Sequence, residues 1–144
     1  MTKHLELESS AELLLQLSQE SVKRCGFSPP LVIVCTREKW MMFNLPEDKN
    51  IWFSVIMMAL RACNAESYSI AYLTWSVKKD QYVEGLSLSE NPSRMEHILV
   101  YGRERSGRAI MWTQQFLHGP NGITFEPVEV ARECCFLRAM PEKW

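Results

Sequence analysis

Hydrophobic side chains recur along this chain with two different periods, and each period predicts a different kind of element. Across residues 9–23 they return every three or four positions, which places them on one face of a helix. Ser9 or Ser10 is the expected N-cap, while Gly26 and the Pro29-Pro30 pair stop the helix. The pattern therefore predicts an amphipathic first helix that packs on the rest of the fold through one stripe.

The most hydrophobic stretch spans residues 46–63. Between residues 51 and 60 the one polar residue is Ser54, so a helix here would be apolar around most of its circumference. Pro46 and the acidic residues after it suit a first helical turn, and Asn64 suits the end. We expect this segment to be the buried central helix of the fold.

Segments rich in branched and aromatic residues, bounded by turn residues, predict the strands. Gly107 suits a positive-φ position in a turn at residues 105–108. A register centred on this turn would place Tyr101 opposite Trp112 as a cross-strand pair. The expected strands are residues 31–35 and 40–45 as one hairpin, residues 68–77, residues 95–104 and 109–117 as a second hairpin, and residues 123–126.

These elements add up to an α+β fold in one domain over residues 1–144. We expect a largely antiparallel sheet of about five to six strands, with the buried central helix and the N-terminal amphipathic helix on one face. Residues 128–140 fit either a helix or a strand, with the helix favoured. Residues 78–94 form an unusually long connection with neither period, and such loops are commonly lids, binding loops or disordered segments.

Composition narrows the class of protein. With 47% hydrophobic and 23% charged residues the chain is ordinary globular, and a net charge of −1 gives no electrostatic footprint for nucleic acid or anionic lipid. The acidic N-terminus lacks the apolar run of a signal peptide, and no apolar run approaches the roughly 20 residues of a membrane span. Five cysteines fit reduced thiols in a cytoplasmic protein, and the vicinal Cys134-Cys135 pair is best interpreted as two small buried side chains.

The long loop and its flanks form the leading candidate binding site. No phosphate loop, dinucleotide fingerprint, serine elbow or zinc-protease motif is present in the sequence, which argues against an enzyme, and we expect no cofactor. Trp75 offers a stacking surface, and arginine pairs with anions in a bidentate manner. An anionic or aromatic small ligand, or a protein partner, is expected to bind at Trp75, Lys78, Lys79, Tyr82, Arg94 and Arg103.

Two alternative sites carry other functions. His97, His118 and Glu96 lie near one end of the second hairpin and would suit a metal-dependent hydrolase if they converged. No spacing in the sequence demonstrates that convergence, so the metal site is the weaker interpretation. The turn from Arg103 to Arg108 would suit nucleic acid, but the net charge makes that partner unexpected.

A resemblance comes from two segments. Tyr72-Leu-Thr-Trp75 and Ser87-Leu-Ser-Glu-Asn-Pro-Ser-Arg94-Met-Glu96 resemble a group of small uncharacterised bacterial and phage α+β proteins, over roughly residues 46–117. The resemblance implies a phage setting and no assigned activity. Thr74 stands where the group often has an acid, which would remove any role of that carboxylate. We also expect Asn91-Pro92 to form a turn, and Arg94 to pair with Glu96 as a loop anchor.

The leading hypothesis is a non-enzymatic cytosolic protein that binds a partner or a small ligand near Trp75. Eight methionines and five tryptophans are many for 144 residues, and exposed members of that set would mark a contact surface. We expect a homodimer that forms through the edge of the sheet or through the first helix.

Overall fold

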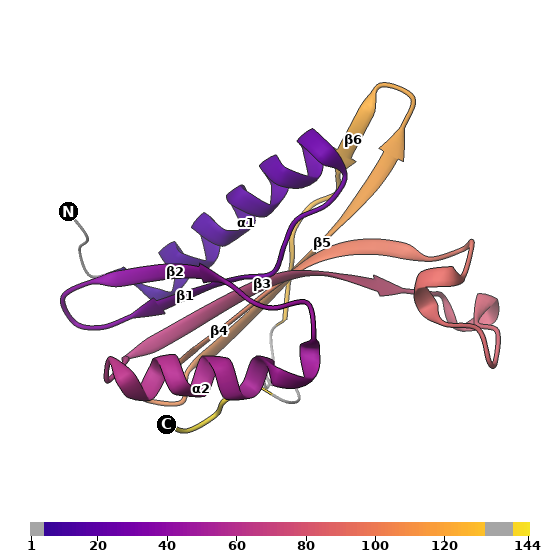
Figure 1. Ribbon diagram of the computed structural model, residues 1–144. Coiled ribbons are helices and arrows are strands. Elements are labelled where there is room, and N and C mark those ends of the chain that lie inside the picture. Colours follow the sequence, from indigo (N-terminus) through magenta and orange to yellow (C-terminus); the bar gives the residue numbers. More distant parts are fainter. Residues whose placement is uncertain (1–4, 132–139) are drawn as a thin grey trace.

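The computed structural model describes residues 5–131 and 140–144. In it, one antiparallel sheet carries a helix on each face (Figure 1). The strand order is β2-β1-β3-β4-β5-β6, and β7 also pairs with β5. The elements are α1 (Leu7–Cys25), β1 (Leu31–Cys35), β2 (Trp40–Asn44), η1 (Lys49–Ile51), α2 (Trp52–Ala62), β3 (Ser67–Ser76), η2 (Lys79–Gln81), η3 (Leu88–Glu90), β4 (Met95–Glu104), β5 (Ala109–Gly119), β6 (Gly122–Phe125) and β7 (Glu129–Val130). The predicted α+β class and antiparallel sheet are confirmed.

The two helices cover opposite faces of the sheet, so the prediction that both share one face is wrong. In β1, Val32 and Val34 belong to the core cluster under α2, whereas Ile33 and Cys35 belong to the cluster under α1. Successive residues of a strand point to opposite faces, and every one of these four is fully buried. A strand that is apolar at each position is typical of a sheet covered on both sides, and β1 has that pattern.

Helix α2 lies on the surface of the sheet, and none of the other described elements encloses it. It buries Trp52, Ile56 and Leu60, a stripe with a spacing of four residues. On its other side Phe53 is 42% exposed and Met58 is 72% exposed. The helix therefore differs from the predicted buried central helix, because its apolar circumference is wider than the one stripe that the sheet covers.

The ends of α2 follow local rules. The Asp48 carboxylate accepts a hydrogen bond from the Asn50 amide at 3.0 Å, which caps the short η1 turn that leads into α2. Pro46 lies before this cap, and its carbonyl accepts a bond from Trp52 Nε1 at 2.6 Å. The helix thus begins later than predicted. It ends at Ala62, and Asn64, two residues later, has a φ of 52°, the left-handed conformation expected of a C-terminal stop.

Helix α1 begins at Leu7, so Ser10 lies inside the helix instead of capping it. The Ser10 hydroxyl is buried against the sheet, 2.6 Å from the Ser69 hydroxyl on β3 and 2.8 Å from the Leu7 carbonyl that it bonds. Gly102 on β4 lies at the same contact. Small residues on both sides let the helix approach the sheet closely at this end. Gly26, with a φ of 74°, ends the helix as predicted.

The second hairpin has its predicted strands but a different register. Tyr101 pairs with Met111, and Trp112 pairs with Val100, so Tyr101 and Trp112 are not opposite each other. The turn contains three residues, with the Gly107 amide bonded to the Glu104 carbonyl at 2.9 Å. A three-residue loop shifts the pairing by one position relative to a two-residue loop. Gly107 has the predicted positive φ, at 108°.

Residues 128–140, for which a helix was favoured over a strand, contain strand β7 instead, because Glu129 and Val130 pair with β5. Residues 132–139, with Cys134 and Cys135, lie outside the described residues. The last residues return to the α2 face, where Trp144 Nε1 donates to the Ala65 carbonyl at 2.7 Å. Among the described residues, no helix is long and apolar enough to cross a membrane.

Candidate functional site

The second half of β3 has a free edge. Strand β1 pairs with β3 only as far as Leu31 opposite Ala71, and residues 27–30 before it are not in a strand. Strand β3 continues through Ser76, paired on its other side with β4. Figure 1 shows β3 running past the end of β1 toward the loop of residues 77–94. Residues 72–76 therefore have a neighbouring strand on one side and, within the described chain, none on the other.

The pairing pattern identifies which backbone groups line this free edge. The Glu66 carbonyl accepts a bond from the Arg105 amide at 2.7 Å, so the backbone groups of Tyr68 and of each second residue after it point toward β4. The backbone groups of Leu73 and Trp75 consequently point away from β4. They are two amide donors and two carbonyl acceptors at a sheet edge, the arrangement that an added strand recognises.

An apolar groove of about 280 Å³ follows this edge. Its lining includes aromatic side chains from three separate segments, together with one carboxylate and one ammonium group. Trp75 is 37% exposed and Phe27 is 58% exposed, whereas Trp52 is almost fully buried. The lining residues are Phe27, Ser28, Pro30, Glu47, Lys49, Trp52, Tyr72, Leu73 and Trp75.

The floor of the groove has a fixed geometry. The rings of Trp52 and Tyr72 meet edge to face, with centroids 5.2 Å apart. The Lys49 ammonium lies 5.1 Å from the Tyr72 centroid and 5.6 Å from that of Trp52, within cation–π range of both. Burial raises the pKa of Tyr72, so its hydroxyl stays protonated and remains a hydrogen-bond donor. The groove can therefore hold an apolar or aromatic group beside polar anchors.

The structure places Trp75 in this groove but not the loop residues expected to accompany it. Lys78, Lys79 and Tyr82 are exposed and do not line it. The loop is held instead by buried Asn91, whose side chain donates to the Gln81 carbonyl at 3.0 Å and accepts from the Ser93 amide at 2.8 Å. Asn91 thus forms the predicted turn and also anchors the loop, a role that was expected of Arg94.

Arg94 and Arg103 belong to other surfaces. Arg94 lines a hollow with Glu96 and His118. It does not form the expected pair with Glu96, because that carboxylate bonds to His118 Nε2 at 2.5 Å. Arg103 is opposite Tyr68 at the far end of β3, seven residues or roughly 23 Å from Trp75 along the strand. Its guanidinium donates to the Glu142 carbonyl at 3.3 Å, so it does not share a site with Trp75.

The three expected metal ligands do not converge. Glu96 and His97 are consecutive residues of β4 and point to opposite faces of the sheet. Glu96 and His118 pair on the α1 face, while His97 lies 2.8 Å from the Ser76 hydroxyl on the other. Among the described residues there is no group of three or more metal-ligating side chains. Glu96, His97 and His118 therefore do not come together as a hydrolytic metal site requires.

The contact between Ser76 and His97 also has the two groups of a hydrolytic pair. Burial lowers the pKa of His97, which favours the neutral ring, and the nearby Glu129 carboxylate opposes this effect. A catalytic pair needs a further group that orients the imidazole. Within the described chain no carboxylate is hydrogen-bonded to His97. The contact is therefore a cross-strand hydrogen bond and carries no catalytic assignment.

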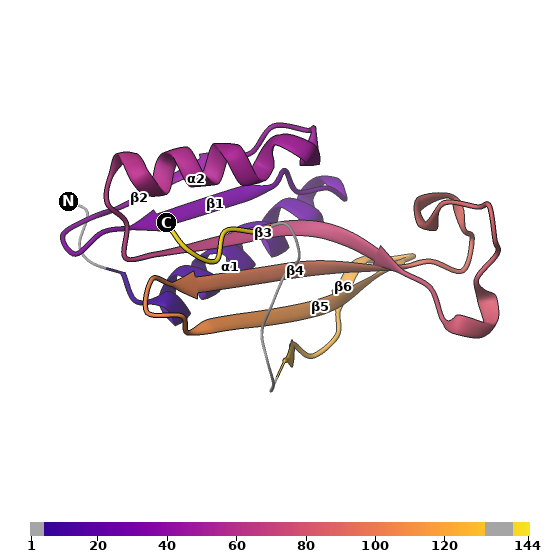
Figure 2. The same ribbon diagram turned by 90° about the horizontal axis from the view of Figure 1, so that it is seen from below.

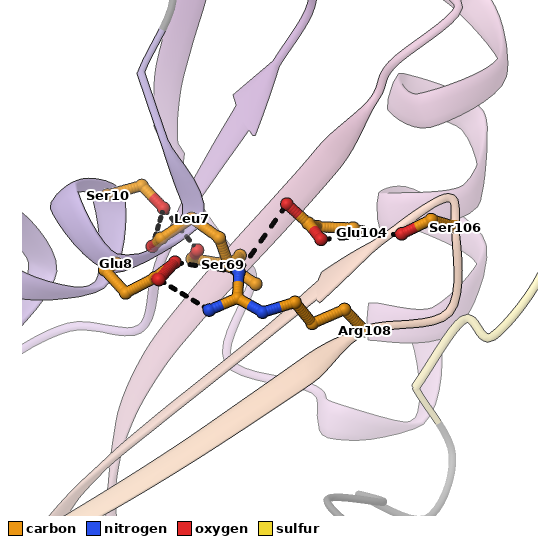
Figure 3. Close-up of polar contacts among 7 residues, drawn as sticks. All are labelled: Leu7, Glu8, Ser10, Ser69, Glu104, Ser106 and Arg108. Atoms are coloured by element: carbon orange, nitrogen blue, oxygen red, sulfur yellow. Dashed lines mark hydrogen bonds and ion pairs between the residues drawn. The ribbon is translucent and has the colours of Figure 1, made fainter.

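The arginine turn is engaged in contacts within the chain (Figure 3). Arg108 donates hydrogen bonds to both carboxylate oxygens of Glu8, at 2.9 and 2.5 Å. Arg105 donates to Asn64 Oδ1 at 2.9 Å. The hollow beside the turn is lined by four carboxylates, from Glu6, Glu8, Glu66 and Glu104. These contacts connect α1 to the second hairpin and favour a structural role over nucleic-acid binding.

Sequence reasoning found Trp75 but missed most of the groove. Phe27 stands in a Gly-Phe-Ser-Pro-Pro linker, and an aromatic residue among helix breakers is a signal that could have identified it. Tyr72 lies three residues before Trp75 in the same strand, and Trp52 was assigned to the core, where most of its ring does lie. Lys49 gives no signal, because a lysine before a helix is usually solvated.

Comparisons of this chain with protein-family models, with curated proteins and with solved structures give no significant match.

Proposed function

We propose that this protein binds an extended segment of a partner protein, which adds as a strand to residues 72–76 of β3. The observation that carries the proposal is the coincidence of unpaired Leu73 and Trp75 backbone groups with an apolar groove along the same edge. Backbone hydrogen bonds supply affinity in this mode of recognition, and a pocket for a side chain supplies specificity. An apolar or aromatic side chain of the partner occupies the groove against Trp75 and Phe27.

Size favours a peptide over a cofactor or drug-sized ligand. Pockets for such ligands enclose about 300–1,000 Å³, and the groove lies just below that range. One aromatic side chain would fill much of it. Because the lining holds one carboxylate and one ammonium, at Glu47 and Lys49, net charge does not select the partner. The unpaired backbone groups of β3 and the aromatic rings of the groove determine which partner binds.

Amide hydrogen exchange of the free protein tests the edge directly. The Leu73 and Trp75 amides should exchange fast, whereas those of Tyr72 and Thr74, which face β4, should be protected. Equal protection of all four amides would contradict a free edge and with it the proposal.

Binding is tested with extended peptides selected from a random peptide library on the immobilised protein. A selected peptide should protect the Leu73 and Trp75 amides, and N-methylation of its alternate amides should abolish that protection. Trp75→Ala should weaken its binding about tenfold or more, because a half-buried tryptophan is a typical binding hot spot. Tyr82→Ala is the matched control, since Tyr82 is an exposed aromatic residue outside the groove, and it should bind as the wild type does.

Two results would contradict the proposal. An equal loss in Tyr82→Ala would move the binding surface to the loop of residues 77–94. Binding of a free indole or a similar ring to the groove, without protection of either amide by any peptide, would show a small-ligand site in place of a strand-addition site.

A further inference from the structure

Strand β2 is the outermost strand on its side of the sheet, and its outward backbone groups are identified by one hydrogen bond. The Leu45 amide donates to the Pro30 carbonyl at 2.9 Å, so Leu45 and each second residue before it direct their backbone toward β1. The intervening residues Trp40, Met42 and Asn44 direct theirs away from the sheet. Within the described chain no strand pairs with this edge.

The edge lacks the features that usually protect an outer strand. Its sequence is Trp-Met-Met-Phe-Asn, with no charge and no proline, and its pairing with β1 is continuous with no bulge. Met42, at the centre, is 43% exposed. On the opposite side of the sheet, β6 has four residues and β7 has two. With five residues, β2 is the longer of the two outer strands.

We propose that β2 pairs with the β2 strand of a second copy of this chain, antiparallel about a twofold axis at Met42. The outward-facing residues are spaced symmetrically about Met42, which makes the edge complementary to itself. Trp40 then pairs with Asn44 of the other copy, and Met42 pairs with its own counterpart. Each of these pairs exchanges two backbone hydrogen bonds, and the two sheets become one continuous sheet.

The side chains agree with this register on both faces. On the α1 face, Met42 meets Met42 at the axis and each Trp40 meets an Asn44. On the α2 face, Met41 of each copy meets Phe43 of the other, and both already pack against the α2 core cluster. No like charges oppose each other anywhere along the strand. A register shifted by one residue would put inward-facing backbone groups opposite outward-facing ones, so the alternation excludes it.

Helix α2 adds apolar surface next to this edge. In Figure 2 it runs along the β2 side of the sheet, on the face that carries Met41 and Phe43, and it leaves Phe53 and Met58 exposed. In the continuous sheet, the α2 helices of the two copies lie on the same face beside the axis. The paired strands are separate from the β3 groove, because no residue of β2 lines that groove.

Native mass spectrometry over a concentration series tests the proposal. The wild type should show twice the 16.8 kDa chain mass, in a proportion that rises with concentration. Met42→Lys and Met42→Glu should each be monomeric and folded by circular dichroism, because each places two like charges together at the axis. An equimolar mixture of the two variants should form a mixed dimer, since the charges then attract. Leu117→Lys is the matched control, with the same 43% exposure on β5, and should dimerise as the wild type does.

Three outcomes would overturn the inference. The first is a wild type that stays monomeric up to about 1 mM, the weak limit of specific association. The second is a dimer that survives in Met42→Lys, which would put the interface elsewhere. The third is two folded monomeric variants that fail to combine when mixed, because only adjacency of the two residues at position 42 predicts rescue.

Discussion

At the scale of single residues, two buried serines of α1 have opposite environments. The Ser10 hydroxyl contacts the Ser69 hydroxyl and the Leu7 carbonyl, whereas the Ser18 hydroxyl has no hydrogen-bond partner among the described residues. Ser10→Ala should lower the free energy of unfolding by about 1–3 kcal/mol, because Ser69 loses a partner in a buried site. Ser18→Ala should leave it unchanged or raise it by about 1 kcal/mol. Urea denaturation of both variants makes the comparison, and a comparable loss in Ser18→Ala would contradict it.

Gly102 lies where β4 and α1 approach each other closely. A Cβ atom there would lie 2.7 Å from Leu7 Cδ1 and 3.0 Å from Ser69 Oγ. Gly102→Ala should therefore destabilise the protein by about 1–3 kcal/mol, the usual cost of overpacking. In a double-mutant cycle measured by urea denaturation, Leu7→Ala should cost less in the Gly102→Ala background than in the wild type. Additive losses would show that Leu7 is not the residue that excludes the methyl group.

At the scale of elements, the strands were predictable from the sequence and the arrangement of the helices was not. The period-two pattern predicted β4 with its observed bounds, Met95–Glu104, because the alternation that identifies a strand depends only on the residues of that strand. Which face a helix covers depends on distant strands, and the apolar run of β1 was the relevant signal. The groove was less predictable still, since Phe27, Trp52 and Trp75 come from three segments that meet only in the fold.

The contact between Glu8 and Arg108 fastens the start of α1 to the second hairpin and should make stability depend on pH. The hydrogen bond from Arg108 holds the pKa of Glu8 below its ordinary value of 4.5. A carboxyl group with a lowered pKa in the folded state contributes stability above its ordinary pKa, and that contribution is lost as pH falls through the folded pKa. As the pH is lowered from 7, the free energy of unfolding should accordingly fall less in Glu8→Gln and in Arg108→Gln than in the wild type. Chemical denaturation over a pH series measures it.

The control for this pair lies in the same turn. Arg105 bonds to the neutral Asn64 side chain, so Arg105→Gln should retain the acid dependence of the wild type. If Arg105→Gln and Arg108→Gln reduce the acid-induced loss of stability equally, that loss depends on the total charge of the turn and not on the specific pair of Arg108 with Glu8.

At the scale of the whole molecule, the sheet separates two core clusters that have no side chain in common among the described residues. Ile56 lies in the α2 cluster and Ile98 in the α1 cluster, and both are fully buried. Apolar side chains are therefore buried on both faces of the same set of strands. Both proposed interfaces lie at the edges of those strands, where neither helix covers the backbone.

This separation predicts additive losses across the sheet. Ile56→Val and Ile98→Val should each lower the free energy of unfolding by about 0.5–1.5 kcal/mol, the typical cost of one buried methyl group. The double variant should lose the sum of the two within about 0.5 kcal/mol, because their side chains lie on opposite sides of the backbone layer and share no packing partner. Chemical denaturation of the four proteins measures the cycle, with an unchanged m-value as the control for two-state unfolding. A larger coupling would mean that the strands move when either face is depleted, and that the two cores act as one.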